Sequence, residues 1–172
     1  MRSLLLICRA DEGAARALHA PVDLSAEIRE VAEFFGPAAV DRGIRLEVDA
    51  PGGLVVPGDP TALRRALSNL VDNALHGSDP GGEVLLRGRL EGGLVRIEVL
   101  DRGCGVPEDS RDRVFERFFR APNARARNAE GTGLGLALVR AVARSHGGEA
   151  TYAPRPGGGS VFGLRFPPAP ES

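Results

Sequence analysis

The chain contains no lysine and no tryptophan, and it has very little cysteine. Its 2 cysteines, Cys8 and Cys104, lie far apart and fit neither a disulfide framework nor a zinc-ligand spacing, which favours a reducing cytoplasm. The longest apolar run, Leu4 to Cys8, is too short for a membrane span or a signal-peptide core. All 22 basic residues are arginine, and a net charge of −1 argues against a general nucleic-acid binder. We therefore expect a soluble cytoplasmic domain that contacts neither nucleic acid nor membrane.

Hydrophobic periodicity predicts a single α/β domain, as the length of 172 residues also suggests. Apolar residues at helical spacing predict helices over 3–19, 25–42, 60–77 and 134–146, and a short helix over 108–119. Alternating or short apolar runs predict strands over 44–48, 54–56, 83–90, 94–100, 150–153 and 160–166. Residues 120–131 read as a loop. This order lacks regular βαβ alternation, so we expect a two-layer sandwich: a mixed, mainly antiparallel sheet with helices on one face.

Capping residues mark the expected helix ends. Ser25 is a suitable N-cap for the helix over 25–42, and Gly43 a suitable C-cap. Asp59 precedes Pro60, which is favoured in the first helical turn, so Asp59 is expected to cap the helix over 60–77.

Two asparagines are the first candidates for chemistry. Asn69 and Asn73 lie four residues apart in the helix over 60–77, so they share one face. Asparagine is a mediocre helix former, and amide oxygens suit Mg²⁺, which also takes phosphate oxygens as ligands. A polar surface edge is the alternative interpretation.

Two glycine clusters extend the pattern. Asp101 follows a predicted strand and precedes Gly103 and Gly105, so its carboxylate can accept from an exocyclic amine such as that of adenine; a simple Asp-Gly turn is the alternative. The cluster Gly131-Thr132-Gly133-Leu134-Gly135-Leu136 enters a helix whose free N–H groups suit a phosphate. The alternative interpretation is a glycine-rich loop that serves packing. The spacing fits neither a P-loop nor the dinucleotide fingerprint.

A basic segment stands between the two clusters. Residues 111–127 hold six arginines against Asp112 and Glu116. This segment is either a solvated loop or a mobile flap near an anionic ligand.

Taken together, these motifs resemble the catalytic and ATP-binding domain of bacterial sensor histidine kinases, in the GHKL ATPase superfamily. The resemblance covers 21–167 and rests on an N-box at 67–74 (LSNLVDNA), a first glycine box at 101–107 (DRGCGVP), an F-box at 114–120 (VFERFFR), a second glycine box at 131–137 (GTGLGLA) and a Gly-Ser-x-Phe element at 159–162. It implies a Bergerat-type sandwich that binds ATP and Mg²⁺.

The resemblance also implies roles for individual residues. Asn73 would coordinate Mg²⁺ with Asn69 beside it, Asp101 would bind the adenine amino group, and Arg120 would reach the γ-phosphate. Residues 120–131 would form a lid over the nucleotide. The remaining expected ATP contacts are His76, Gly103, Gly105, Val106, Gly131, Thr132, Gly133, Leu134, Gly135 and Leu136.

The same resemblance implies a domain plan and partners. Residues 1–20 would end a truncated dimerisation helix, 21–168 would form the ATP-binding domain, and 169–172 would be a tail. The phosphoacceptor motif is absent, so we expect a truncated kinase that acts on a histidine of its own or a partner chain's dimerisation domain. A response regulator would be the further partner, and the full-length protein a homodimer, with an anchor in the inner membrane left open.

Two departures from the family pattern bear on affinity. His76 stands where a basic residue usually faces phosphate, and Gly77 replaces an aromatic residue beside the adenine. Both predict weak ATP binding. They keep open a degenerate domain that acts in docking or regulation. An ATP-hydrolysing GHKL machine is the other alternative, disfavoured because Asn69 stands where such enzymes carry a glutamate base.

Overall fold

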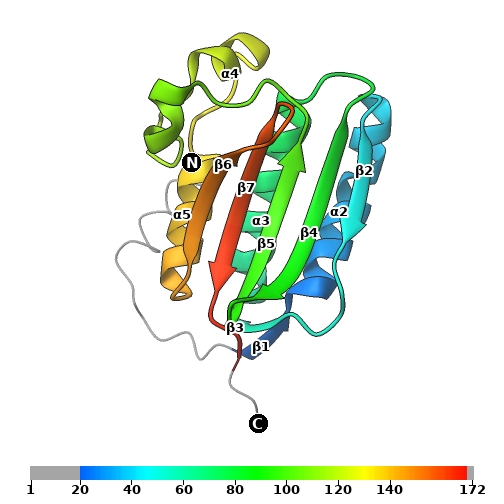
Figure 1. Cartoon of the computed structure of the whole chain (residues 1–172), viewed down its shortest axis with the longest axis vertical. Helices are drawn as coiled ribbons and strands as arrows, with labels where there is room; N and C mark the ends of the chain where they lie inside the picture. Colours follow the sequence, from blue (N-terminus) through cyan, green and yellow to red (C-terminus); the bar gives the residue numbers. More distant parts are fainter. Residues whose placement is uncertain (1–19, 170–172) are drawn as a thin grey trace.

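In the computed structural model, which describes residues 20–169, a five-stranded sheet carries helices on one face and leaves its other face open (Figure 1). The spatial order is β2 (Arg45–Asp49), β4 (Glu83–Glu91), β5 (Leu94–Asp101), β7 (Ser160–Phe166) and β6 (Glu149–Pro154). Only β2 and β4 pair in parallel; the other pairs of this sheet are antiparallel. The predicted fold class is therefore confirmed. The predicted helix over 3–19 lies outside the described residues.

The helices α2 (Leu24–Asp41), α3 (Pro60–Gly77) and α5 (Gly135–Ser145) cover the inner face (Figure 1). Asp59 caps α3 as predicted, because its carboxylate accepts from the N–H groups of Thr61 and Ala62. The expected cap of α2 is wrong. Asp23 accepts from the N–H of Ser25, and the Ser25 hydroxyl instead donates to the carbonyl of Pro51 at 2.5 Å.

Three local predictions differ from the structure. A strand, β1 (Ala20–Asp23), pairs antiparallel with β3 (Val55–Gly58) in a separate small sheet that the sequence did not indicate. The helix expected over 108–119 is only a 3₁₀ helix, η1 (Glu108–Arg113), because these charged residues offer no apolar stripe to bury. The expected loop contains α4 (Pro122–Arg127), which buries no residue and so left no hydrophobic period to detect.

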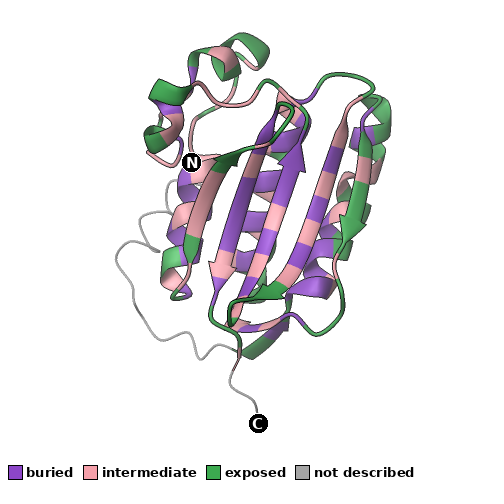
Figure 2. Ribbon diagram, viewed as in Figure 1, coloured by how far each residue is buried: buried purple, intermediate pink, exposed green. Residues whose placement is uncertain are grey.

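One continuous core lies between the helices and the sheet. Buried and less buried residues alternate along β4, β5 and β7 (Figure 2), as expected of strands with one packed face. Val84, Leu86 and Ile97 are fully buried inward-facing residues of this core. Within 20–169, no helix is both long and apolar enough to span a bilayer.

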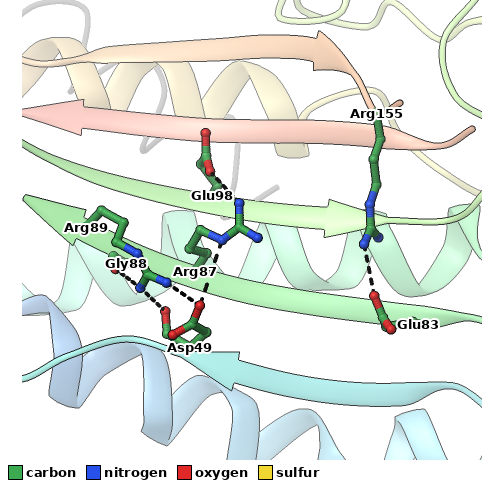
Figure 3. A network of polar contacts seen from close by, with 7 residues as sticks. All are labelled: Asp49, Glu83, Arg87, Gly88, Arg89, Glu98 and Arg155. Atoms are coloured by element: carbon green, nitrogen blue, oxygen red, sulfur yellow. Dashed lines mark hydrogen bonds and ion pairs between the residues drawn. The ribbon is translucent and has the colours of Figure 1, made fainter. Parts of the chain in front are cut away.

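The open face of the sheet is charged and internally paired. Arg87 lies 3.8 Å from Glu98, and Arg155 lies 2.9 Å from Glu83 across the intervening strands (Figure 3). Opposite charges that face one another across neighbouring strands support the register and keep this face soluble.

Candidate nucleotide-binding site

A cavity of about 360 Å³ lies between α3, the end of β5, the start of α5 and the segment that carries α4. Its walls include every site residue expected from the sequence except Gly103 and Leu134: Asn69, Asn73, His76, Asp101, Gly105, Val106, Arg120, Gly131, Thr132, Gly133, Gly135 and Leu136. Residues from motifs far apart in the chain therefore meet in one hollow of a size suited to a small ligand.

Asp101 is the buried acid of this cavity. It ends β5 and is 3% exposed. Its Oδ1 atom accepts from the backbone N–H of Gly103 at 2.8 Å and of Ser160 at 3.1 Å. Burial raises the pKa of the Asp101 carboxyl above its ordinary value, and those two hydrogen bonds oppose the shift without cancelling it. No described group donates to Oδ2, so this oxygen remains available to accept from a ligand amine.

Gly103 serves packing, because it lies behind the wall of the cavity. A Cβ placed on Gly103 would stand 2.0 Å from the carbonyl oxygen of Gly77 at the end of α3. The neighbouring N–H of Cys104 donates to the same oxygen at 3.2 Å. Only glycine allows the loop after β5 to close onto α3 at this point, which holds Asp101 beside the helix end.

The asparagine pair occupies the cavity wall on α3. The Nδ2 group of Asn69 donates to the carbonyl of Arg65 at 2.8 Å, which leaves Oδ1 facing the start of α5, 2.9 Å from where a Cβ on Gly135 would stand. The Asn73 amide makes no hydrogen bond within the described residues. An amide oxygen of this kind is a suitable Mg²⁺ ligand. No cluster of three or more histidine, cysteine or carboxylate residues offers an alternative cation site in residues 20–169.

The second glycine cluster leads into α5 without a side-chain cap. The N–H groups of the first turn are therefore left for solvent or a ligand. Gly133 adopts a positive φ of 72°, and its carbonyl accepts from the N–H of Phe118 at 3.0 Å. Leu134 precedes α5 and packs against the core, which explains why it lies outside the cavity wall.

Arg120 organises the segment that was expected to form a lid. Its guanidinium donates to the carbonyl groups of Ala124 at 3.1 Å, Ala129 at 3.2 Å and Asn128. It also lies against Gly131, where an added Cβ would stand 2.9 Å from Nη2. The arginine thus lies on the cavity wall, and its hydrogen bonds hold the segment around α4.

His76 lies on the cavity wall, where both of its ring nitrogens contact polar groups. Its Nδ1 lies 2.8 Å from the carbonyl oxygen of Asp72, so this nitrogen is assigned the proton. Its Nε2 lies 3.3 Å from Nη2 of Arg42 and therefore accepts. The same Nδ1 also lies 3.3 Å from a carboxylate oxygen of Asp72.

Further cavity residues were not predicted. Asn123 and Arg127 of α4 line the cavity, and so does Cys104. The Nδ2 group of Asn123 donates to the carbonyl of Gly105 at 2.9 Å, which joins α4 to the loop after β5. The run of arginines over 111–127 was the only sequence signal for this wall, and it does not show which arginine turns inward.

Comparison with known proteins agrees with this geometry. A family model described as histidine kinase-, DNA gyrase B- and HSP90-like ATPase matches residues 58–170. The sensor-like histidine kinase SenX3 of Mycolicibacterium smegmatis is 44% identical over 153 residues, which make up 88% of this chain and 40% of SenX3. This chain therefore spans well under half the length of that relative.

Two solved structures have the same fold. The mycobacterial sensor histidine kinase MprB superposes with a TM-score of 0.77 at 36% identity, over 88% of this chain and 100% of that structure. Full-length ShkA in complex with AMPPNP superposes with a TM-score of 0.83 at 32% identity, over 99% of this chain and 35% of ShkA. The chain belongs to the histidine kinase-, DNA gyrase B- and HSP90-like ATPase family and, within it, to the catalytic ATP-binding domains of sensor histidine kinases.

Proposed function

We propose that this chain binds Mg-ATP and donates the γ-phosphate to a histidine on a separate dimerisation domain. The observation that carries the proposal is the single cavity in which Asp101, the asparagine pair and the uncapped start of α5 meet. The structure of ShkA, which is similar in fold and was solved with AMPPNP, supports a nucleotide as the ligand.

Helix α3 sets the spacing between the two functional groups. Gly77, at its end, contacts the loop that holds Asp101, whereas Asn69 contacts Gly135 at the start of α5. Eight residues separate Asn69 from Gly77, which is about 12 Å of helix. This length suits a nucleotide that lies along α3 with its base near Asp101 and its phosphates near Asn69 and Asn73.

Asp101 would bind the base. The free Oδ2 atom accepts from an exocyclic amine, which adenine carries and guanine lacks at the equivalent ring position. The N–H groups of Gly103 and Ser160 hold the carboxylate in one orientation. Selectivity for adenine follows because a carbonyl in place of the amine would face a carboxylate oxygen, with no proton between them.

The other wall would hold the phosphates and the cation. The amide oxygen of Asn73 would ligate Mg²⁺ beside Asn69, and the N–H groups at the start of α5 would receive phosphate oxygens. Mg²⁺ would neutralise part of the triphosphate charge. Arg120 would turn from the lid carbonyl groups toward the γ-phosphate.

Phosphotransfer requires little covalent chemistry from this chain. Its residues bind, orient and screen the triphosphate, and the attacking histidine would come from the dimerisation domain of its own or a partner chain. Asn69 favours transfer over hydrolysis, because an amide cannot serve as the base that activates water. A homodimeric full-length kinase and a response regulator that takes the phosphoryl group complete the proposal.

Calorimetric titration with AMP-PNP tests the proposal directly. Adenine-selective binding, strengthened by Mg²⁺ and absent with GMP-PNP, is expected. A phosphotransfer assay with ATP and a separately supplied dimerisation domain then tests the activity. If millimolar AMP-PNP shows no binding, the catalytic proposal is wrong and a docking role takes its place.

A further inference from the structure

We infer that Arg127 forms the base-side wall of the cavity and stacks its guanidinium on the nucleobase. This inference rests on the proposed nucleotide binding and adds to it a residue that the family motifs do not include. Arg127 ends α4, lines the cavity and has a side chain that is 32% exposed.

The edge of the Arg127 guanidinium is held by Asp79, which lies outside the cavity wall, and by the carbonyl of Gly77, which lies on it. Its Nη1 donates to Oδ1 of Asp79 at 2.8 Å, and its Nη2 donates to Oδ2 of the same carboxylate at 3.2 Å. Nη1 also lies 3.2 Å from the carbonyl oxygen of Gly77. Such a forked pair fixes the plane of the guanidinium. Three of its five N–H donors are used in these contacts, and with the plane fixed in this way the planar face is available to a ligand.

Arg127 belongs to the same end of the cavity as Asp101. The carbonyl oxygen of Gly77 that Arg127 contacts also accepts from the N–H of Cys104, and Gly103 packs against it. The N–H of Gly103 in turn donates to the Asp101 carboxylate. Gly77 and Gly103 therefore link Arg127 to the group that would bind the base amine, whereas Asn69, beside Gly135, lies about two turns of α3 away.

Gly77 leaves room for the stacking group. A Cβ placed on Gly77 meets nothing within 4 Å, so the wall at this point is open. Position 77 carries no side chain to stack on a base, and the guanidinium plane of Arg127 would supply such a surface. Arginine stacks well on aromatic systems because its charge is delocalised and weakly hydrated. Stacking does not discriminate between bases, so the choice of adenine would remain with Asp101.

The test compares a ligand with phosphates and one without. We expect Arg127→Ala, in the full chain, to weaken binding of AMP-PNP and of adenosine by the same factor, about three- to tenfold. Arg125→Ala is the matched control, because Arg125 lies on the same helix but not on the cavity wall. It is expected to leave both affinities unchanged.

A second variant distinguishes stacking of Arg127 on the base from an ion pair with Asp79 that only holds α4 in place. Gly77→Tyr, added to Arg127→Ala, places a ring on the open wall and is expected to restore most of the affinity for both ligands. A residue that merely fastened α4 to Asp79 would not be rescued in this way. Asp79→Asn, which weakens the fastening but keeps the guanidinium, is expected to cost less affinity than Arg127→Ala.

Several outcomes would overturn the inference. A loss confined to AMP-PNP would place Arg127 at the phosphates, and equal affinities for Arg127→Ala and Arg125→Ala would remove it from the site. Binding of AMP-PNP by the wild-type chain without detectable binding of adenosine would also count against a stacking wall. A wild-type chain that binds neither ligand would instead overturn the proposed function itself.

Discussion

Asp101 combines burial with ionisation at a single residue. The fold removes its carboxyl group from water and returns only two backbone hydrogen bonds, both to Oδ1. Burial raises its pKa, so the folded chain binds a proton at Asp101 more readily than the unfolded chain. The contribution of this group to stability is therefore largest when it is protonated and is lost as pH rises through the raised pKa. Such a costly group suggests a role in binding rather than in stability.

We predict that Asp101→Asn removes ATP binding and leaves the fold intact. The asparagine oxygen can still accept from Gly103 and Ser160, but its NH₂ group then faces the adenine amine, and two donors repel. A loss of about a hundredfold or more in affinity is expected. Calorimetry measures it, and thermal unfolding at neutral pH should show a variant no less stable than the wild type. Normal ATP binding by the variant would exclude Asp101 from the adenine site.

The same residue predicts a pH dependence of binding. Protonation of Asp101 converts the accepting oxygen to a hydroxyl, so adenosine affinity should fall as pH decreases through the raised pKa. Adenosine is the suitable ligand because it has no phosphate to titrate. A pH-independent affinity down to the ordinary range of an aspartate would contradict the assignment.

His76 lies on the part of the cavity wall that is proposed to hold the phosphates. In the structure its ring nitrogens contact Arg42 and Asp72. We predict that His76→Lys tightens binding of AMP-PNP by about three- to tenfold, because a lysine is charged at neutral pH and donates to phosphate. Adenosine affinity should stay the same, and this serves as the internal control. Unchanged or weaker AMP-PNP binding would mean that position 76 does not face the phosphates.

At the scale of elements, helix α4 itself is held by polar contacts rather than by buried side chains. Helix α4 buries no residue, and Asn123 and Arg127 join it to the loop after β5 and to the end of α3. Elements without buried apolar contacts open at a low free-energy cost. The segment can therefore move as a nucleotide enters, while α3 and α5, which belong to the core, stay in place.

A buried histidine joins α5 to α3. His146 is 8% exposed, its Nε2 accepts from the N–H of Asp59 at 3.0 Å, and its Nδ1 donates to the carbonyl of Val142 at 2.7 Å. The contact places the end of α5 at the start of α3. Since both helices form cavity walls, His146 helps to fix the two walls relative to one another, although it does not line the cavity itself.

We predict that His146→Ala lowers the free energy of unfolding by about 2 kcal/mol, because the buried N–H of Asp59 loses its acceptor. Urea unfolding measures the change. Arg144→Ala, at an exposed position two residues away, is the matched control and should be nearly neutral. Equal stability of the two variants would show that the contact contributes nothing.

At the scale of the whole molecule, a sheet with one packed face must keep its other face soluble. The charged residues of the open face form pairs across strands, and Arg155 reaches over β7 and β5 toward Glu83 (Figure 3). The side chain of Arg155 is 11% exposed, and its Nη1 atom is buried without a hydrogen-bond partner. The positive charge of Arg155 is therefore stabilised by Glu83 to a greater extent than the charge of an exposed arginine, which water also stabilises.

We predict that Glu83→Gln destabilises the fold by about 1 kcal/mol at neutral pH. The hydrogen bond from Arg155 lowers the pKa of Glu83, so its contribution is present above the unfolded pKa and is lost as pH falls through the lowered pKa. The stabilities of wild type and variant should therefore converge in acid. Glu149→Gln is the control, because Glu149 is 69% exposed and lies 3.9 Å from Arg165. A larger effect of the control would contradict this account.

The sequence by itself determined the elements that have an apolar period or a strong cap. Helix α3 could be predicted almost to the residue because its stripe is regular and Asp59 and Pro60 mark its start. The hairpin strands β4 and β5 follow from alternation around a glycine turn. The motif residues could be named in advance because the paired amides, the acid and the glycine clusters follow one another in the order that the family resemblance implies.

Only the tertiary structure decided how these elements and loops pack against one another. Gly103 packs against Gly77, Arg127 donates to the carbonyl of Gly77, and Asp23 rather than Ser25 caps α2. Strand β1 and helix α4 likewise depend on pairing or polar contacts with distant residues. Local sequence reports apolar periodicity and capping chemistry, but it does not report which polar group meets which across the fold, because that is set by how the packed elements place them.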